Sequence, residues 1–155
     1  MLKRLKKRAD EEQGFTLIEL MVVVLIIGIL IAIALPTFLG ARERAQNRAA
    51  QSSLRNALVA AKTAYTDSGD YSTAAHTDLG ANEPSLQYVD TASTGPNVIS
   101  VDVPTGDTVW SAAALSDSGV CYWISDDSTG PGTEYGSGAA CVGTDATTGA
   151  TNPTW

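Results

Sequence analysis

The sequence predicts an α+β protein: a long N-terminal α-helix, membrane-spanning in its first half, packs against a small antiparallel β-sheet head that ends in a disulfide-tethered C-terminal loop. Three observations predict this class. An almost unbroken apolar run covers residues 17–35, helix-forming residues continue beyond it to residue 68, and the remaining chain is rich in Gly, Ser, Thr and Asp with short β-rich runs. The 155 residues leave room for one domain of ordinary size.

The apolar run predicts a segment that crosses a membrane. It contains a single charged residue, Glu19, and at about 1.5 Å per residue it reaches across a hydrocarbon core of roughly 30 Å. We assign residues 15–39 to the membrane-spanning first half of the predicted helix. Basic residues that flank a first apolar segment stay on the cytoplasmic side, so we expect the N-terminus inside and the chain from Arg42 onward outside. Five such residues precede the run, namely Lys3, Arg4, Lys6, Lys7 and Arg8. A secretory signal fits less well, because its apolar core is shorter and ends at a small-residue cleavage site.

Helical periodicity continues into the second half of the helix. Apolar residues recur at steps of four, three and four, which places them on one helix face; they are Leu54, Leu58, Ala61 and Tyr65. The turn-forming residues 67–70 end the pattern. We therefore predict one helix over residues 15–68, weakened at Gly28 and Pro36, where flexibility is expected.

Basic residues form a stripe beside this apolar face. At about 100° per residue the four members fall within about 40° of each other; they are Arg44, Arg48, Arg55 and Lys62. The stripe is either a solvated flank or a possible inter-subunit surface that meets acidic heads of adjacent copies. All ten Lys and Arg lie at or before Lys62, and twelve acidic residues follow it. The part of the chain after Lys62 is therefore acidic and repels phosphate, so no direct nucleic-acid binding by the head is expected.

Three short runs predict strands after the helix. They cover residues 97–103, 108–115 and 119–125 and are joined by short turn-forming segments, which favour antiparallel pairing. Such a sheet can bury the apolar stripe of the helix within a head over residues 40–155. Residues 71–96 are expected to form a loop-rich connection. Residues 126–155 contain too little apolar surface to hold a core of their own.

Two cysteines, Cys121 and Cys141, lie on the predicted outer side of the membrane. In an oxidising compartment such a pair forms one disulfide, and closing a loop of about 20 residues stabilises the fold by roughly 3 kcal/mol. Two free buried thiols are the alternative. No metal site is predicted, because the single histidine, His76, is distant in sequence and no paired ligand spacing exists.

The carboxylate in the apolar run requires a partner. A charged side chain costs roughly 2.5–3.5 kcal/mol at the bilayer centre, and less near the interface. Cleavage after Gly14 would create an amine on Phe15, about 6 Å along the axis from Glu19. Between neighbouring copies the acid and the amine could pair, and because this contact does not close on itself it generates an open helical polymer. The alternative is an anchor helix that tolerates an interfacial Glu.

The residues from Gly14 to Glu19, Gly-Phe-Thr-Leu-Ile-Glu, together with the basic leader over residues 1–14, resemble a type IV pilin precursor of the type IVa kind. The resemblance implies that a membrane-embedded prepilin peptidase cuts after Gly14 and methylates the new amine of Phe15. It also implies that Glu19 pairs with the N-terminus of a neighbouring subunit, and that the helix between Gly28 and Pro36 loosens in the fibre. The leader is longer than in many type IVa pilins.

The resemblance implies a structural subunit, the major pilin of a type IV pilus filament that serves attachment, motility or DNA uptake. The precursor would lie in the inner (cytoplasmic) membrane, in contact with lipid and the pilus assembly machinery, before joining an extracellular homopolymer. A pseudopilin of a type II secretion system is an alternative, in which Asp126 and Asp127 could mimic a calcium site. A tethered binding module that never polymerises is another. We expect no enzyme and no cofactor, because no catalytic pairing or phosphate loop is present.

Overall fold

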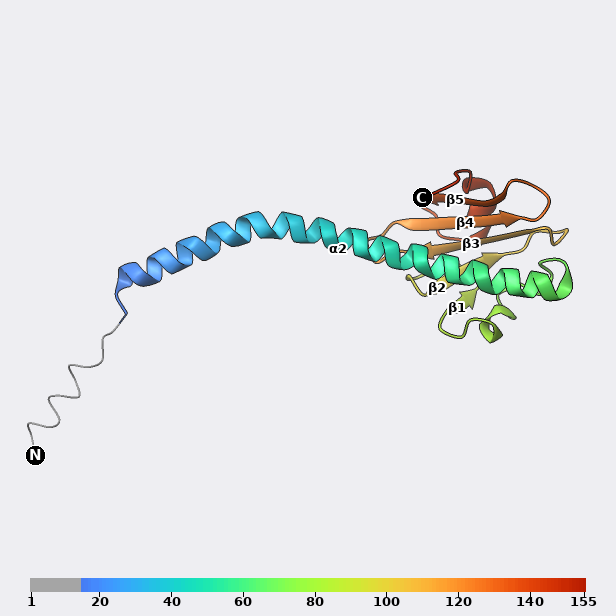
Figure 1. Ribbon diagram of the computed structural model, residues 1–155, viewed down its shortest axis with the longest axis horizontal. Coiled ribbons are helices and arrows are strands. Elements are labelled where there is room, and N and C mark those ends of the chain that lie inside the picture. The colour runs from blue at the N-terminus through green and yellow to red at the C-terminus, as the bar shows by residue number, and fades with distance from the viewer. Residues whose placement is uncertain (1–14) are drawn as a thin grey trace, which may run out of the picture. The chain divides into compact units, whose positions relative to one another are not determined.

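The computed structural model describes residues 15–155, so the predicted leader, residues 1–14, lies outside the described residues. A long helix leads into a five-stranded sheet and a short final helix, which confirms the α+β class (Figure 1). In chain order the elements are α2 (Leu17–Ser68), the 3-10 helix η1 (Leu79–Ala81), β1 (Gln87–Val89), β2 (Val98–Asp102), β3 (Val109–Leu115), β4 (Cys121–Asp127), β5 (Gly132–Gly138) and α3 (Gly143–Gly149).

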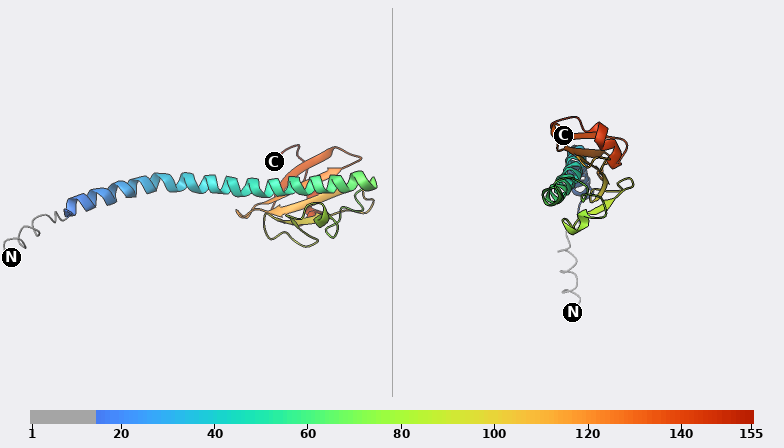
Figure 2. Two further views of the ribbon diagram at one scale, coloured as in Figure 1. Left: turned by 60° about the horizontal axis from the view of Figure 1, so that its bottom comes forward. Right: turned by 90° about the vertical axis from the view of Figure 1, so that its right-hand side faces the viewer.

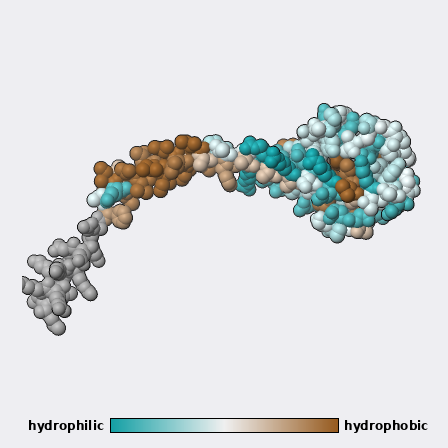
Figure 3. All heavy atoms as spheres, in the orientation of Figure 1, coloured by the Kyte–Doolittle hydropathy of each residue, from teal (hydrophilic) through white to brown (hydrophobic). Residues whose placement is uncertain are grey.

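The chain divides into two compact units that meet between Ala41 and Arg42. In the first unit, the side chains of residues 15–39 are all exposed on the single chain. On the face that Figure 3 shows, most of this segment is apolar apart from its start. Among the described residues, α2 is the one helix long and apolar enough to cross a membrane. It continues through Gly28 and Pro36, and the loosening expected between them stays a prediction.

In the second unit, the rest of α2 lies across one face of the sheet (Figure 2). The predicted apolar stripe is confirmed as the core-facing side of the helix: Leu54 and Ala61 are fully buried, Leu58 is buried, and Tyr65 is partly buried against the same cluster. Trp110, the largest fully buried side chain, joins this core from β3 and donates a hydrogen bond from Nε1 to the carbonyl of Ala74, 3.1 Å away.

The strand order is β1-β2-β3-β4-β5, with antiparallel pairing from β2 to β5. The three predicted strands are therefore confirmed as β2, β3 and β4. Side chains alternate between the two faces of β3: Ala112 and Ala114 face the α2 core, and Ala113 faces a second, smaller cluster around the cysteines. The sheet lies between two layers, because α3 contacts four of its strands on that second side.

Two segments contain more structure than their sequences predict. The connection over residues 71–96 includes η1 and β1, and β1 pairs with β2 in parallel. The C-terminal part is more than a tethered loop, since it supplies the edge strand β5 and the helix α3. Glycine is required there by packing: an added Cβ at Gly138 or Gly149 would lie 2.1 or 2.3 Å from the ring of Trp123.

Candidate functional site

The start of α2 positions the predicted assembly carboxylate. Glu19 Oε2 accepts hydrogen bonds from the backbone N–H of Thr16 at 2.8 Å and from its Oγ1 at 2.6 Å. The backbone N–H of Glu19 in turn lies 3.3 Å from Thr16 Oγ1. This reciprocal pair is a capping box, which satisfies donors that a helix N-terminus otherwise leaves free.

Thr16 is a hydrogen-bond partner of the candidate carboxylate that the sequence analysis did not single out. The signal was present, because Thr-x-x-Glu ahead of an apolar run is the pattern of a capping box. Both contacts of the carboxylate use Oε2, so Oε1 has no hydrogen-bond partner among the described residues. The carboxylate can therefore keep its place on the helix start and still accept a donor from outside the chain.

Phe15, the residue predicted to carry the new amine, directly precedes Thr16 and is 89 % exposed. Gly14 lies outside the described residues, so cleavage and methylation stay predictions. Among the described residues, Thr16 is the one hydrogen-bond partner of the Glu19 carboxylate. Within the described residues, Oε1 of Glu19 is thus available to a further donor.

The predicted basic stripe divides into two pairs. Lys62 forms an ion pair with Asp126, with Nζ 2.9 Å from Oδ1. Arg55 lies over the ring of Trp155, with Cζ 4.8 Å from the ring centroid. Arg44 and Arg48 are exposed, and no acidic oxygen of the described residues lies within 4.0 Å of them. Two members of the stripe therefore stabilise their own head, and two remain available.

Asp126 is the buried acid of the head, with 5 % of its surface exposed. Its Oδ2 accepts a hydrogen bond from Tyr71 Oη at 2.5 Å, and its Oδ1 is bound by Thr133 Oγ1 as well as by Lys62. Burial alone would raise the pKa of Asp126, but the hydrogen bonds from Thr133, Tyr71 and Lys62 outweigh it and hold the pKa below its usual value. For Tyr71, burial and the neighbouring Asp126 raise the pKa.

These contacts explain why the acidic pair does not resemble a cation site. Asp126 uses both oxygens within the chain, and Asp127 accepts hydrogen bonds from the N–H and Oγ1 of Thr129 at 2.8 and 2.9 Å. Among residues 15–155, no group of three or more His, Cys, Asp or Glu side chains has a metal-binding arrangement.

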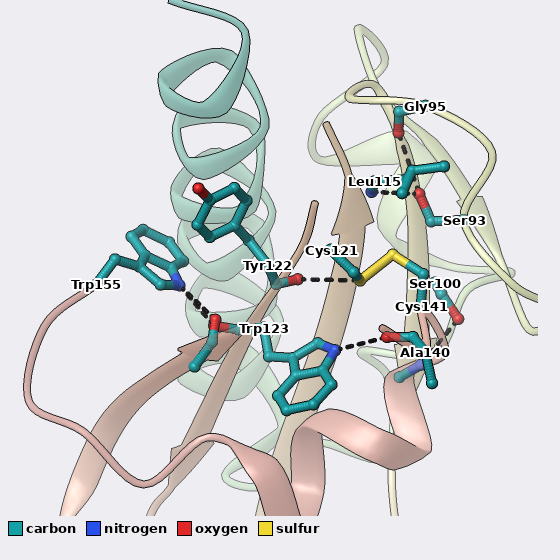
Figure 4. The surroundings of a disulfide bond; sticks show 12 residues. Ser93, Gly95, Ser100, Leu115, Cys121, Tyr122, Trp123, Ala140, Cys141 and Trp155 are labelled. Atoms are coloured by element: carbon teal, nitrogen blue, oxygen red, sulfur yellow. Dashed lines mark hydrogen bonds between the residues drawn. A yellow bond between two sulfur atoms is a disulfide. The ribbon is translucent and has the colours of Figure 1, made fainter. Parts of the chain in front are cut away.

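The predicted disulfide is confirmed. Cys121 and Cys141 are joined by an S–S bond of 2.04 Å, with their Cα atoms 5.4 Å apart (Figure 4). It connects the start of β4 to the segment that leads into α3. Two further hydrogen bonds hold that segment: Trp123 Nε1 donates to the carbonyl of Ala140 at 3.0 Å, and the N–H of Ser93 donates to the carbonyl of Cys141 at 2.8 Å.

Comparisons with known proteins match both parts of the chain. A family model described as "Prokaryotic N-terminal methylation motif" matches residues 11–35. The type IV wide pilus major component PilA4 of Thermus thermophilus is 32 % identical over 112 residues, which cover 70 % of this chain and 85 % of that protein. No solved structure matches.

Two other relatives match over shorter stretches. The type IV major pilin protein PilA of Myxococcus xanthus is 41 % identical over 69 residues, 44 % of this chain and 31 % of the relative. The type II secretion system core protein G of Escherichia coli is 42 % identical over 55 residues, 34 % of this chain and 38 % of the relative. The chain thus spans less than two fifths of the length of these two relatives.

The long apolar helix and the methylation motif indicate a membrane-anchored precursor, whose head is a sheet closed by a disulfide. With the similarity that covers 85 % of the Thermus thermophilus pilus component, the chain belongs to the type IV pilin and pseudopilin family.

Proposed function

We propose that this chain is the major pilin of a type IV pilus filament. A prepilin peptidase cuts after Gly14 and methylates Phe15, and the mature chains polymerise through residues 15–39 into a surface filament. The observation that carries the proposal is a helix half whose apolar side chains are all exposed on the single chain. An apolar surface of this size needs a partner. Lipid covers it in the precursor, with the N-terminus on the cytoplasmic side, and neighbouring helices cover it in the filament.

The proposed assembly step depends on Glu19. Cleavage turns the amide nitrogen of Phe15 into an amine, which carries a positive charge beside the apolar core of the filament. Glu19 Oε1, which Thr16 leaves without a partner, accepts the amine of an adjacent subunit. Few water molecules surround this contact, so the charge pair is stronger than it would be in bulk solvent. Each subunit offers one acid and one amine, and the repeated contact builds an open polymer.

Substitution of Glu19 tests the proposal. We expect Glu19→Ala to abolish fibres in electron micrographs of sheared cell-surface material. The matched control is Glu43→Ala, which removes the other glutamate of α2 at an exposed position outside the apolar half. Intact-mass analysis of the surface protein should find a chain that begins at methylated Phe15 and lacks two hydrogens for the disulfide. Normal fibres from Glu19→Ala, or a surface chain that keeps residues 1–14, would contradict the proposal.

A pseudopilin of a type II secretion system is the second candidate, because 55 residues are 42 % identical to the E. coli core protein G. Two features favour the pilin: the C-terminal disulfide and the internal use of Asp126. Deletion of the gene separates the two functions. Loss of long fibres with normal protein secretion supports the pilin, and the opposite pattern supports the pseudopilin.

Within this proposal the chain is a structural subunit and not an enzyme, it needs no cofactor, and its head does not bind nucleic acid directly. The filament serves attachment, motility or DNA uptake. A membrane-tethered module that never polymerises would yield no fibres from the unsubstituted chain, so the same electron micrographs exclude or establish it.

A further inference from the structure

Positive charge that the head does not use for itself lies at one end of it. Arg42, Arg44 and Arg48 are exposed in the first turns of α2 within the head. The β3–β4 turn lies at the same end, because Ser116 Oγ donates to Asn47 Oδ1 at 2.8 Å. That turn contributes Asp117, and with Glu43 it offsets part of the charge of the three arginines.

The opposite end of the head is acidic. It holds the last turn of α2, the start of β3 and the end of β4, which lie together in Figure 1. Two contacts join these parts: the N–H of Tyr71 donates to the carbonyl of Asp107 at 2.8 Å, and Val109 pairs with Asp127. No Lys or Arg follows Lys62 in the sequence. We define the acidic tip as Asp67, Asp70, Asp107 and Asp127.

Within the head, Asp70 accepts hydrogen bonds from Ser72 and Asp127 from Thr129, but the stability of the head does not explain Arg44, Arg48 or Asp67. Arg44 and Arg48 have no acidic partner among the described residues, in contrast to Lys62. Asp67 is exposed in the last turn of α2, which contains no basic residue. A negative charge is unfavourable there, because the carbonyl groups at a helix C-terminus already carry partial negative charge.

We propose that Arg44 and Arg48 of one copy contact the acidic tip of the next copy along the filament. This inference rests on the proposed function and names the surface by which heads are placed in register. Residues 44 and 67 are separated by about 35 Å along the helix, at 1.5 Å per residue, so the contact runs head to tail. The two ends differ and the contact does not close, as an open polymer requires. Exposed charges of this kind set orientation and register more than affinity, and salt screens them.

A charge swap in the full chain tests the contact, with fibres sheared from cells counted in electron micrographs. Arg48→Glu and Asp67→Lys should each reduce fibres by about tenfold or more, because like charges then face each other. The double variant Arg48→Glu/Asp67→Lys should restore fibres to within about twofold of the unsubstituted chain, because the pair is rebuilt with reversed signs. The matched control is Arg42→Glu, which changes net charge equally at a position about 120° around the helix from Arg48.

Each outcome decides the inference. Normal fibres from Arg48→Glu, or a double variant no better than the single ones, would overturn it and leave the proposed function intact. If the unsubstituted chain forms no fibre, both this inference and the proposed function are wrong. A disulfide-bonded head with unchanged tryptophan fluorescence shows that each variant is folded. If Arg48→Glu instead keeps its fibres but weakens binding of the full chain to phosphatidylglycerol vesicles relative to phosphatidylcholine vesicles, the arginines face lipid and the inference is wrong.

Discussion

The two halves of α2 form one continuous helix but differ in where their apolar surface goes. In the first half Leu25 is 61 % exposed, whereas in the second half Leu54 is fully buried under the sheet. The first half is apolar on every side, so no single face is selected for packing within the chain. The second half carries apolar residues on one face only, and the sheet covers that face. The second half of the helix thus serves folding, and under the proposed function the first half serves assembly.

The largest effect is expected when one leucine is truncated in each half. Leu54→Ala should lower the free energy of unfolding of the head by about 3–5 kcal/mol, through lost burial and the cavity it leaves. Leu25→Ala should leave that free energy unchanged and reduce fibre yield instead. Denaturant unfolding of the full chain in detergent, followed by tryptophan fluorescence, measures the first quantity. Equal destabilisation by both substitutions would remove the distinction between the halves.

Removal of the disulfide should affect the head alone. Replacement of Cys121 and Cys141 by serine should lower the free energy of unfolding by about 3 kcal/mol, because the unfolded chain regains the freedom of the closed loop. The helical signal of the apolar half in detergent should not change. Circular dichroism and denaturant unfolding, with and without a reductant, measure both. An unfolding midpoint that does not respond to the substitution would contradict this prediction.

The buried acid should make the head sensitive to low pH. The pKa of Asp126 lies below its unfolded value, so the stability it contributes is present above the ordinary aspartate pKa of about 3.9 and is lost as pH falls through the folded value. Asp126→Asn should cost about 1–3 kcal/mol at neutral pH, since Lys62 loses its ion pair and a hydrogen bond is weakened. The difference between the two proteins should shrink below about pH 4. Denaturant unfolding at several pH values measures this difference in the free energy of unfolding. A difference that stays constant with pH would show that the carboxylate of Asp126 does not supply the stability.

The smallest effect on folding is expected at the end of α2. Asp67→Lys should raise the free energy of unfolding by about 0.3–1 kcal/mol, because a positive charge suits a helix C-terminus. The same change should reduce fibre yield if the acidic tip contacts another copy. If Asp67→Lys raises the free energy of unfolding but lowers the fibre yield, Asp67 serves the filament and not the fold of the head. A loss of head stability would show that the acid supports its own fold.

Most of the regular structure follows from local patterns. The predicted helix over residues 15–68 and the strands over 97–103, 108–115 and 119–125 match α2, β2, β3 and β4 to within two residues at each end. β5 and α3 were not predicted, because Gly-Thr-Glu-Tyr-Gly-Ser-Gly and Gly-Thr-Asp-Ala-Thr-Thr-Gly lack an apolar period. In the structure β5 pairs with β4 along its length, Trp123 packs against glycines of both segments, and Cys141 ties the segment that leads into α3 to β4.

The residues of the candidate site also divide into those that the sequence identified and those whose contacts only the structure shows. Glu19 was identifiable because a lone carboxylate in an apolar run is costly. The expected cleavage after Gly14 came from the resemblance of residues 14–19 to pilin precursors. The roles of the basic residues were not, because helix geometry groups Arg44, Arg48, Arg55 and Lys62 together without saying what each one meets. Only the placement of Asp126 and Trp155 separates the two engaged residues from the two available ones.

The sequence by itself determined the apolar half of α2 and the acid within it, since these depend on composition and on short-range periodicity. It indicated the family through the resemblance of residues 14–19 to pilin precursors. The tertiary structure decided which charges are used inside the head, how glycine-rich segments become strand and helix, and that the two ends of the head differ in charge. Those properties depend on contacts between residues far apart in the chain, for which local patterns carry no information.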